Sequence, residues 1–200
     1  MIRTRLTRLL IPAGMAVLTA LLLGCNGTSG VASGPTALGT LPAAQSALAT
    51  AAPDARLLVV QTASSVTATG TPVWVYLFGD PETDKTYLVY ASDGQSMGAA
   101  QEYGTAGLSE AEWKDVPDTY TWKVDSDDAY TKALAASGAT GDPAGYMMGL
   151  MTYKSSADTS TVEPLVWNVW FDPGPSGATQ STVLVDAQSG DASIAESEAP

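Results

Sequence analysis

The clearest pattern of apolar and polar positions lies in the last quarter of this 200-residue chain. Two runs rich in aromatic and β-branched residues, Leu165–Phe171 and Ser181–Ala187, flank a segment of Asp, Pro, Gly and Ser. Such runs predict strands and the residues between them favour turns, so we predict an antiparallel hairpin. A hairpin this apolar needs a cover on one face, and the nearest helix-like segment upstream is Asp127–Ala136.

A similar order occurs earlier in the chain. Ala43–Ala52 contains strong helix formers and stops before Pro53. Three β-branched or aromatic runs follow and predict strands: Arg56–Thr62, Val73–Phe78 and Thr86–Ala91. The Gly- and Ala-rich stretch Gln95–Gly107 then predicts a loop. Because no helix separates the strands, this order indicates an antiparallel meander and an α+β fold, a helix packed on an antiparallel sheet.

The two regions indicate an internal repeat. Residues Pro72–Pro81 align with Pro164–Pro173 without a gap, which places Trp74 opposite Val166. Aligning Trp74 with Trp167 instead requires a shift of one residue, which would move every side chain to the other face of the strand. Both registers remain open, and so does the alternative that two hairpins of any antiparallel domain look this similar.

The middle of the chain contains two further helix starts. Ser109–Glu112 is a capping box that opens a short helix before Pro117. Asp125 or Ser126 is the predicted N-cap of the helix over Asp127–Ala136, and Gly138 is its predicted stop. Two flanking segments are less regular: Tyr120–Val124 alternates like an edge strand, and Tyr146–Lys154 fits either a strand or a helical turn.

The N-terminus has the pattern of an export signal. Three arginines lie within the first eight residues, and the apolar run Leu9–Leu23 is shorter than the roughly 20 residues that span a bilayer as a helix. The run ends in Leu22-Leu23-Gly24-Cys25, which resembles the lipobox of bacterial lipoproteins and contains the chain's one cysteine. The resemblance implies lipidation of Cys25, by a diacylglyceryl group and usually an acyl chain such as palmitate, with cleavage before it. An ordinary secretory leader or an uncleaved anchor are the alternatives.

These patterns predict an order of segments along the chain. We expect a lipoprotein signal peptide over residues 1–24 and a lipidated flexible tether over 25–42. A first helix-plus-strands unit over 43–100, a linker with a short helix over 101–118 and a second, related unit over 119–194 should follow, and 195–200 should be a disordered tail. The tether prediction depends on the Gly-, Ser-, Thr- and Ala-rich composition of residues 26–42.

Composition narrows the chemistry. The formal net charge of −12 disfavours nucleic acid as a partner, and the chain contains no histidine, the commonest general base and transition-metal ligand. Asp125, Asp127 and Asp128 do not match a calcium-binding EF-hand loop and fit helix capping better. The methionines Met97, Met147, Met148 and Met151 fit core packing better than copper ligation. We therefore predict no cofactor, no metal and no catalytic residue.

The second unit resembles a PepSY module. The resemblance depends on Trp122–Ala129 leading an acid-capped helix, on the strand with Trp167, and on Val185-Asp186-Ala187-Gln188-Ser189-Gly190, which has serine where the family has threonine. It implies a cystatin-like α+β fold and a non-catalytic role in binding or restraining peptidases or other envelope partners.

The expected function is therefore that of a lipid-anchored binding protein on the extracytoplasmic face of the cell membrane, or of the outer membrane. One of Trp167 and Trp170 should face away from the core, and these two residues are the candidates for the contact surface. The alternative is a carboxylate-dependent hydrolase of cell-wall glycan, which would need two acids facing each other across a cleft.

Overall fold

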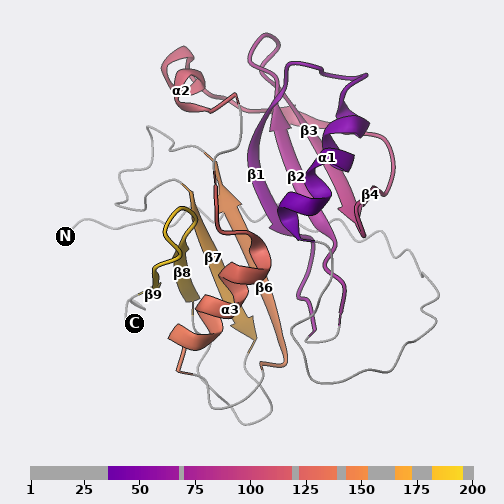
Figure 1. Ribbon diagram of the computed structural model, residues 1–200. Coiled ribbons are helices and arrows are strands. Elements are labelled where there is room, and N and C mark those ends of the chain that lie inside the picture. The colour runs from indigo at the N-terminus through magenta and orange to yellow at the C-terminus, as the bar shows by residue number, and fades with distance from the viewer. Residues whose placement is uncertain are drawn as a thin grey trace. The chain divides into compact units, whose positions relative to one another are not determined.

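The computed structural model describes residues 36–67, 70–118, 122–138, 143–152, 165–172 and 182–195. These residues belong to one compact unit. The predicted signal peptide, Cys25 and the last five residues lie outside the described ranges. The fold is α+β, as the sequence predicts (Figure 1).

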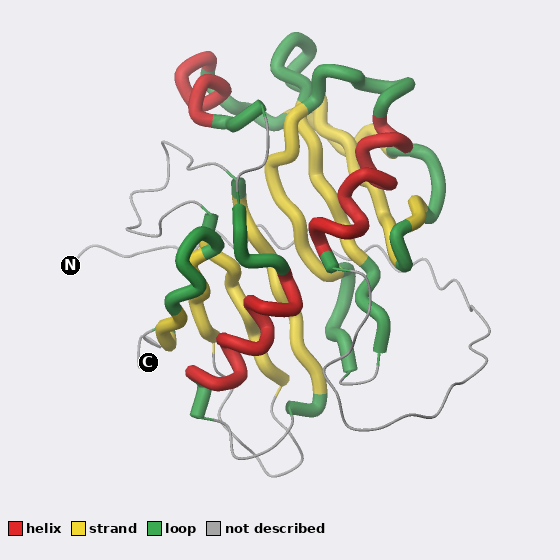
Figure 2. Tube along the Cα trace, in the orientation of Figure 1, coloured by secondary structure: helices red, strands yellow, loops and turns green. Residues whose placement is uncertain are grey.

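One antiparallel sheet of nine strands organises the described chain (Figure 2). Its strands lie side by side in the order β4-β3-β2-β1-β6-β7-β8-β9, and β5 also pairs with β3. Their bounds are β1 Arg56–Thr62, β2 Trp74–Gly79, β3 Lys85–Ser92, β4 Gln95–Ser96, β5 Gln101–Thr105, β6 Gly145–Met151, β7 Val166–Asp172, β8 Thr182–Asp186 and β9 Ala192–Ile194.

Two helices cover the same face of this sheet. Helix α1 (Ala37–Leu48) contacts β2, β3 and β4, and α3 (Ser126–Ala136) contacts β7, β8 and β9. Both helices contribute to one hydrophobic cluster with the strands below them. The short α2 (Glu110–Asp115) lies on the opposite face, where its Trp113 packs against Gly79 at the end of β2.

The two regions with the same predicted order are two halves of this one sheet. In each half a helix precedes three antiparallel strands, and the first strands of the halves, β1 and β6, pair at the centre. The two predicted units are therefore not separate domains, because main-chain hydrogen bonds between β1 and β6 join them. Gln61 pairs with Gly149 at this central junction.

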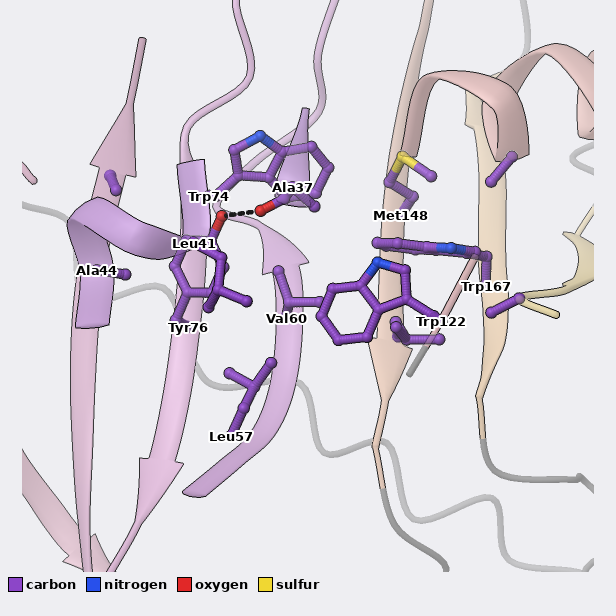
Figure 3. Packing of buried hydrophobic residues seen from close by; sticks show 14 of the residues in the cluster. Ala37, Leu41, Ala44, Leu57, Val60, Trp74, Tyr76, Trp122, Met148 and Trp167 are labelled. Carbon is purple, nitrogen blue, oxygen red and sulfur yellow. Dashed lines mark hydrogen bonds between the residues drawn. The ribbon is translucent and has the colours of Figure 1, made fainter. Parts of the chain in front are cut away.

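The core lies between the sheet and its two long helices, and Figure 3 shows its centre. Trp74 and Trp167 both point into it, so the alignment that matches these tryptophans puts equivalent side chains on the same face. Their ring centroids are 6.4 Å apart, and the ring of Trp122 is 6.3 Å from that of Trp167. The Nε1–H of Trp167 donates to the carbonyl of Val124 at 2.8 Å, which satisfies its buried polar atom.

The cap predictions are confirmed. Asp125 is the N-cap of α3, and Ser109 and Glu112 form the capping box of α2. Asp125 also reaches the other long helix: its Oδ1 accepts from the N–H of Ser126 at 2.7 Å and from the N–H of Leu38 in α1 at 3.1 Å. The beginnings of the two helices are thereby joined.

The start of α1 differs from the prediction. The helix begins at Ala37 and includes Pro42, whereas the sequence predicted a tether through residue 42 and a helix over Ala43–Ala52. Thr36 caps the helix by accepting from the N–H of Gly39 at 3.0 Å. Ala37 and Leu41 are buried on the sheet, and this packing offsets the hydrogen bond that Pro42 cannot donate.

Two other segment predictions change, and one pair of alternatives is decided. The predicted loop Gln95–Gly107 contains β4 and β5, which are polar edge strands that only pairing with β3 defines. The described part of the predicted strand Tyr120–Val124 is not a strand, because Lys123 and Val124 both donate to the carbonyl of Ala187. Between the two alternatives for Tyr146–Lys154, the structure has a strand, the central β6.

Candidate functional site

The two candidate tryptophans of β7 lie on opposite faces of the sheet. Trp167 is completely buried under the helices, with Val169 and Phe171 on the same side. Trp170 is 37% exposed and points to the other face. Because successive side chains of a strand alternate, residues three apart face opposite ways. Trp170 is therefore the candidate that a partner could touch.

The neighbours of Trp170 follow from the strand register, since residues directly opposite each other share a face. Across strands β3 to β8, three cross-strand rows form a patch on this side of the sheet, which we call the uncharged face: Tyr90, Val75, Gln61, Gly149, Asn168 and Leu184; Leu88, Leu77, Val59 and Met151; Met147, Trp170 and Thr182. Val75, Leu77 and Leu88 are buried, as is Gly149, and the others are half-buried or exposed.

None of these thirteen residues is an acid or a base, although the chain carries 21 acidic residues. Acids lie on the same side of the sheet beyond these rows, where the strands end: Asp172 is the last residue of β7 and pairs with Gly145, and Asp186 is the last of β8 and pairs with Val166. The N–H groups of Ser189 and Gln188 donate to Asp186 and hold the pKa of its carboxyl below the usual value. Asp186 is therefore a negative charge at the margin of the uncharged face near neutral pH.

The side chains exposed on this face are of the types found at the centre of protein interfaces. Met151 is 39% exposed and Tyr90 37% exposed, close to the value for Trp170. Aromatic residues and methionine are enriched in interface cores, and charged residues are depleted there. The face can thus bind a partner by burying apolar surface.

A shallow depression elsewhere is a weaker candidate. It lies beside α2 and is lined by Arg56, Glu82, Asp84, Glu110 and Lys114, among others. Two of its cations are already paired: Arg56 with Asp118 at 2.8 Å and Lys114 with Glu110 at 3.0 Å. Arg56 also donates to the carbonyls of Trp113 and Val116, so its role is to hold α2 against β1.

The residues considered for metal binding are separated in the fold. Within the described ranges, no three His, Cys, Asp or Glu side chains are grouped so that they could hold a metal ion. Asp125 serves as a helix cap. Met148 is in the core, whereas Met147 and Met151 lie on the uncharged face and Met97 is exposed beyond the end of β4.

Sequence reasoning missed Tyr90, Met147 and Met151 as companions of Trp170. A signal for the methionines exists, because residues 147, 149 and 151 share one face if the segment is a strand. Tyr90 carries no such signal. Tyr90 lies on the same face as Trp170 only because β3, β2, β1, β6 and β7 pair in this order.

Comparisons with known proteins do not assign the chain to a family. No family model matches it, and no curated protein matches it. One solved structure, described as a "putative lipoprotein" from Clostridium difficile 630, is similar at 13% identity and a TM-score of 0.45. The match covers 72% of this chain and 82% of that protein.

No helix in the described residues has both the length and the apolar composition that a membrane crossing requires.

Proposed function

We propose that this protein is a non-catalytic binding protein of the bacterial envelope, held to the membrane by lipid on Cys25, and that it binds its partner with the uncharged face. The single observation that carries the binding role is the exposure of Trp170 beside Met147 in a patch whose paired rows contain no acid or base. An exposed tryptophan contributes large apolar area at an interface, and tryptophan is enriched among the residues that dominate binding energy.

The lipid anchor is supported by the leader and by the position of the first helix. Residues 26–35 separate Cys25 from Thr36, the N-cap of α1. Ten residues span at most about 36 Å when fully extended. An anchor at Cys25 would therefore keep the sheet near the membrane, and two or three acyl chains would hold it firmly.

A PepSY-like relationship of the two halves is part of the proposal. The described residues of the motif give it a structural reason: Asp186 accepts from the N–H groups of Gln188 and Ser189, and Gly190 has φ of +80°. A carboxylate that closes the turn and a glycine in the left-handed region explain the need for Asp and Gly at these positions.

Two experiments test the proposed function. The anchor predicts that labelling with a fatty acid marks the wild-type protein and not Cys25→Ala, and equal labelling would contradict it. The binding role predicts that a photoreactive amino acid at position 170 cross-links to a discrete partner in producing cells. The same group at Tyr103, exposed on β5 and outside the uncharged face, should give no such product. Equal cross-linking from both positions would contradict a partner surface around Trp170.

A further inference from the structure

We infer that the partner of the uncharged face is a cationic amphipathic polypeptide segment, with apolar side chains at its centre and Lys or Arg around them. The inference rests on the proposed function, since it specifies the chemistry of the partner for that same face. Two independent features carry it: the apolar centre and the charge around it.

The centre requires apolar contact. Tyr90, Met151 and Trp170 come from three different strands and each exposes more than a third of its surface. Gln61 and Asn168 are the only amide side chains in the three rows, so the face offers few polar groups to a partner. Burying apolar area contributes roughly 25 cal/mol per Å². A partner whose matching surface is polar would gain little here and would lose its hydration.

The surroundings require positive charge. The chain has 21 acidic residues against 9 basic ones, and three of those bases lie in the N-terminal leader. In the described residues, Arg56, Lys85 and Lys114 each pair with an acid, Lys85 with Glu102 at 2.8 Å. Acidic residues therefore outnumber basic ones by more than two to one, and Asp172 and Asp186 place two of the acids at strand ends next to the face. A cationic segment is attracted by this field.

The same charge disfavours the other occupants of an apolar face. A second copy would bring an equally acidic surface into contact, and like charges brought together at an interface cost several kcal/mol. An anionic bilayer surface is repelled for the same reason. The width also fits a segment of moderate length, because six strands about 4.8 Å apart span about 24 Å, or roughly 16 residues of helix.

The test compares two tryptophan-free, fluorescein-labelled 18-residue peptides that share one leucine face and carry either lysine or glutamate on the other. The full chain, reconstituted in phosphatidylcholine vesicles, is titrated with each peptide, and protein-free vesicles give the background. We expect the lysine peptide to bind at least tenfold more tightly than the glutamate peptide. Its affinity should decrease as the salt concentration is raised from 50 to 300 mM.

Variants locate the binding. Trp170→Ser with Met151→Ser should weaken binding of the lysine peptide at least tenfold. The matched control, Tyr103→Ser with Ile194→Ser, changes two side chains of similar exposure outside the uncharged face and should stay within twofold. Thr182→Lys removes no apolar side chain and should reduce or reverse the preference for lysine. This variant keeps the test decisive if the double variant fails to fold.

Several outcomes would overturn the inference: equal affinity of the two peptides, equal loss in both double variants, or self-association of the wild type that the Trp170 and Met151 changes abolish. Four of the five tryptophans are buried, so the part of the acrylamide quenching that Trp170→Ser removes reports on Trp170. If the wild type shows this part in detergent but not in vesicles without peptide, the bilayer covers the face, and this result would also overturn the inference. A cross-link from position 170 together with equal peptide affinities would remove the charge preference and leave the binding role in place. Equal cross-linking from positions 170 and 103 would instead remove the binding role.

Discussion

Trp74 and Trp167 meet at the centre of the core, with ring centroids 6.4 Å apart and ring planes at 62°. Each lies on the second strand of its half of the sheet, and the two strands are separated by the central pair β1 and β6. Trp74 pairs with Thr62 of β1, and Trp167 pairs with Leu150 of β6. The two halves thus share one core, and the second strand of each half contributes a buried tryptophan to it.

Trp167→Ala should destabilise the protein far more than Trp170→Ala. Trp167 is fully buried, and its substitution removes two ring contacts and a hydrogen bond. We therefore expect the free energy of unfolding to fall by about 3–5 kcal/mol. Trp170 lies on the other face, and its substitution by alanine should lower the free energy of unfolding by about 1 kcal/mol or less. Urea unfolding of the two variants measures the difference. Similar losses for both would contradict the assignment of their faces.

Asp125→Ala should lower the free energy of unfolding by about 2 kcal/mol. The carboxylate caps α3 and also accepts from the N–H of Leu38 in α1, so the change removes two hydrogen bonds to helix starts. Asp127→Ala is the matched control, because Asp127 is an exposed acid in the first turn of the same helix and affects only its dipole. Thermal unfolding should place the control close to the wild type. Equal losses would show that the link to α1 contributes nothing.

Gly79→Ala should destabilise by about 1–3 kcal/mol through overpacking. A Cβ at this position would lie 2.6 Å from a ring carbon of Trp113 and 2.8 Å from a methyl carbon of Leu58. Gly104→Ala on β5 is the control, because its nearest neighbour would be 4.0 Å away. Denaturant unfolding measures both variants. A neutral effect at Gly79 would mean that α2 does not pack against β2 there.

Stability should fall steeply above pH 10. Burial raises the pKa of Tyr146 to about 12, and burial with the charge of Asp125 raises the pKa of Tyr76 further. An unfolded tyrosine ionises near pH 10, so above that pH the unfolded chain binds fewer protons than the folded one and unfolding becomes more favourable. The contribution of Tyr146 is fully present below pH 10 and is lost as the pH rises to about 12.

Tyr146→Phe should therefore flatten the decline of unfolding free energy between pH 9 and pH 11.5. Unfolding by urea at several pH values, with tyrosinate absorbance followed in parallel, measures this slope. The same slope in the variant and the wild type would contradict a buried neutral phenol at position 146.

The predictable features were those that depend on residues close together in the chain. Ser109 and Glu112 form a capping box because a hydroxyl and a carboxylate three residues apart can reach each other's N–H groups. The aromatic and β-branched run Leu165–Phe171 predicted a strand, and the odd spacing of Trp167 and Trp170 predicted that one of them faces away from the core. The same local reasoning failed at α1, where Pro42 marked a boundary that the structure does not have.

Local sequence patterns were sufficient to predict the helix caps, the strands β7 and β8 and the α+β class, because hydrogen-bonding side chains and runs of apolar residues act within a few positions. The tertiary structure alone decided that β1 pairs with β6, that the polar segments β4 and β5 become strands, and that Tyr90, Met151 and Trp170 share a face. These features depend on main-chain hydrogen bonds between residues far apart in the chain. Every residue except proline has both a main-chain donor and an acceptor for such bonds, so the residue types do not show which strands will pair.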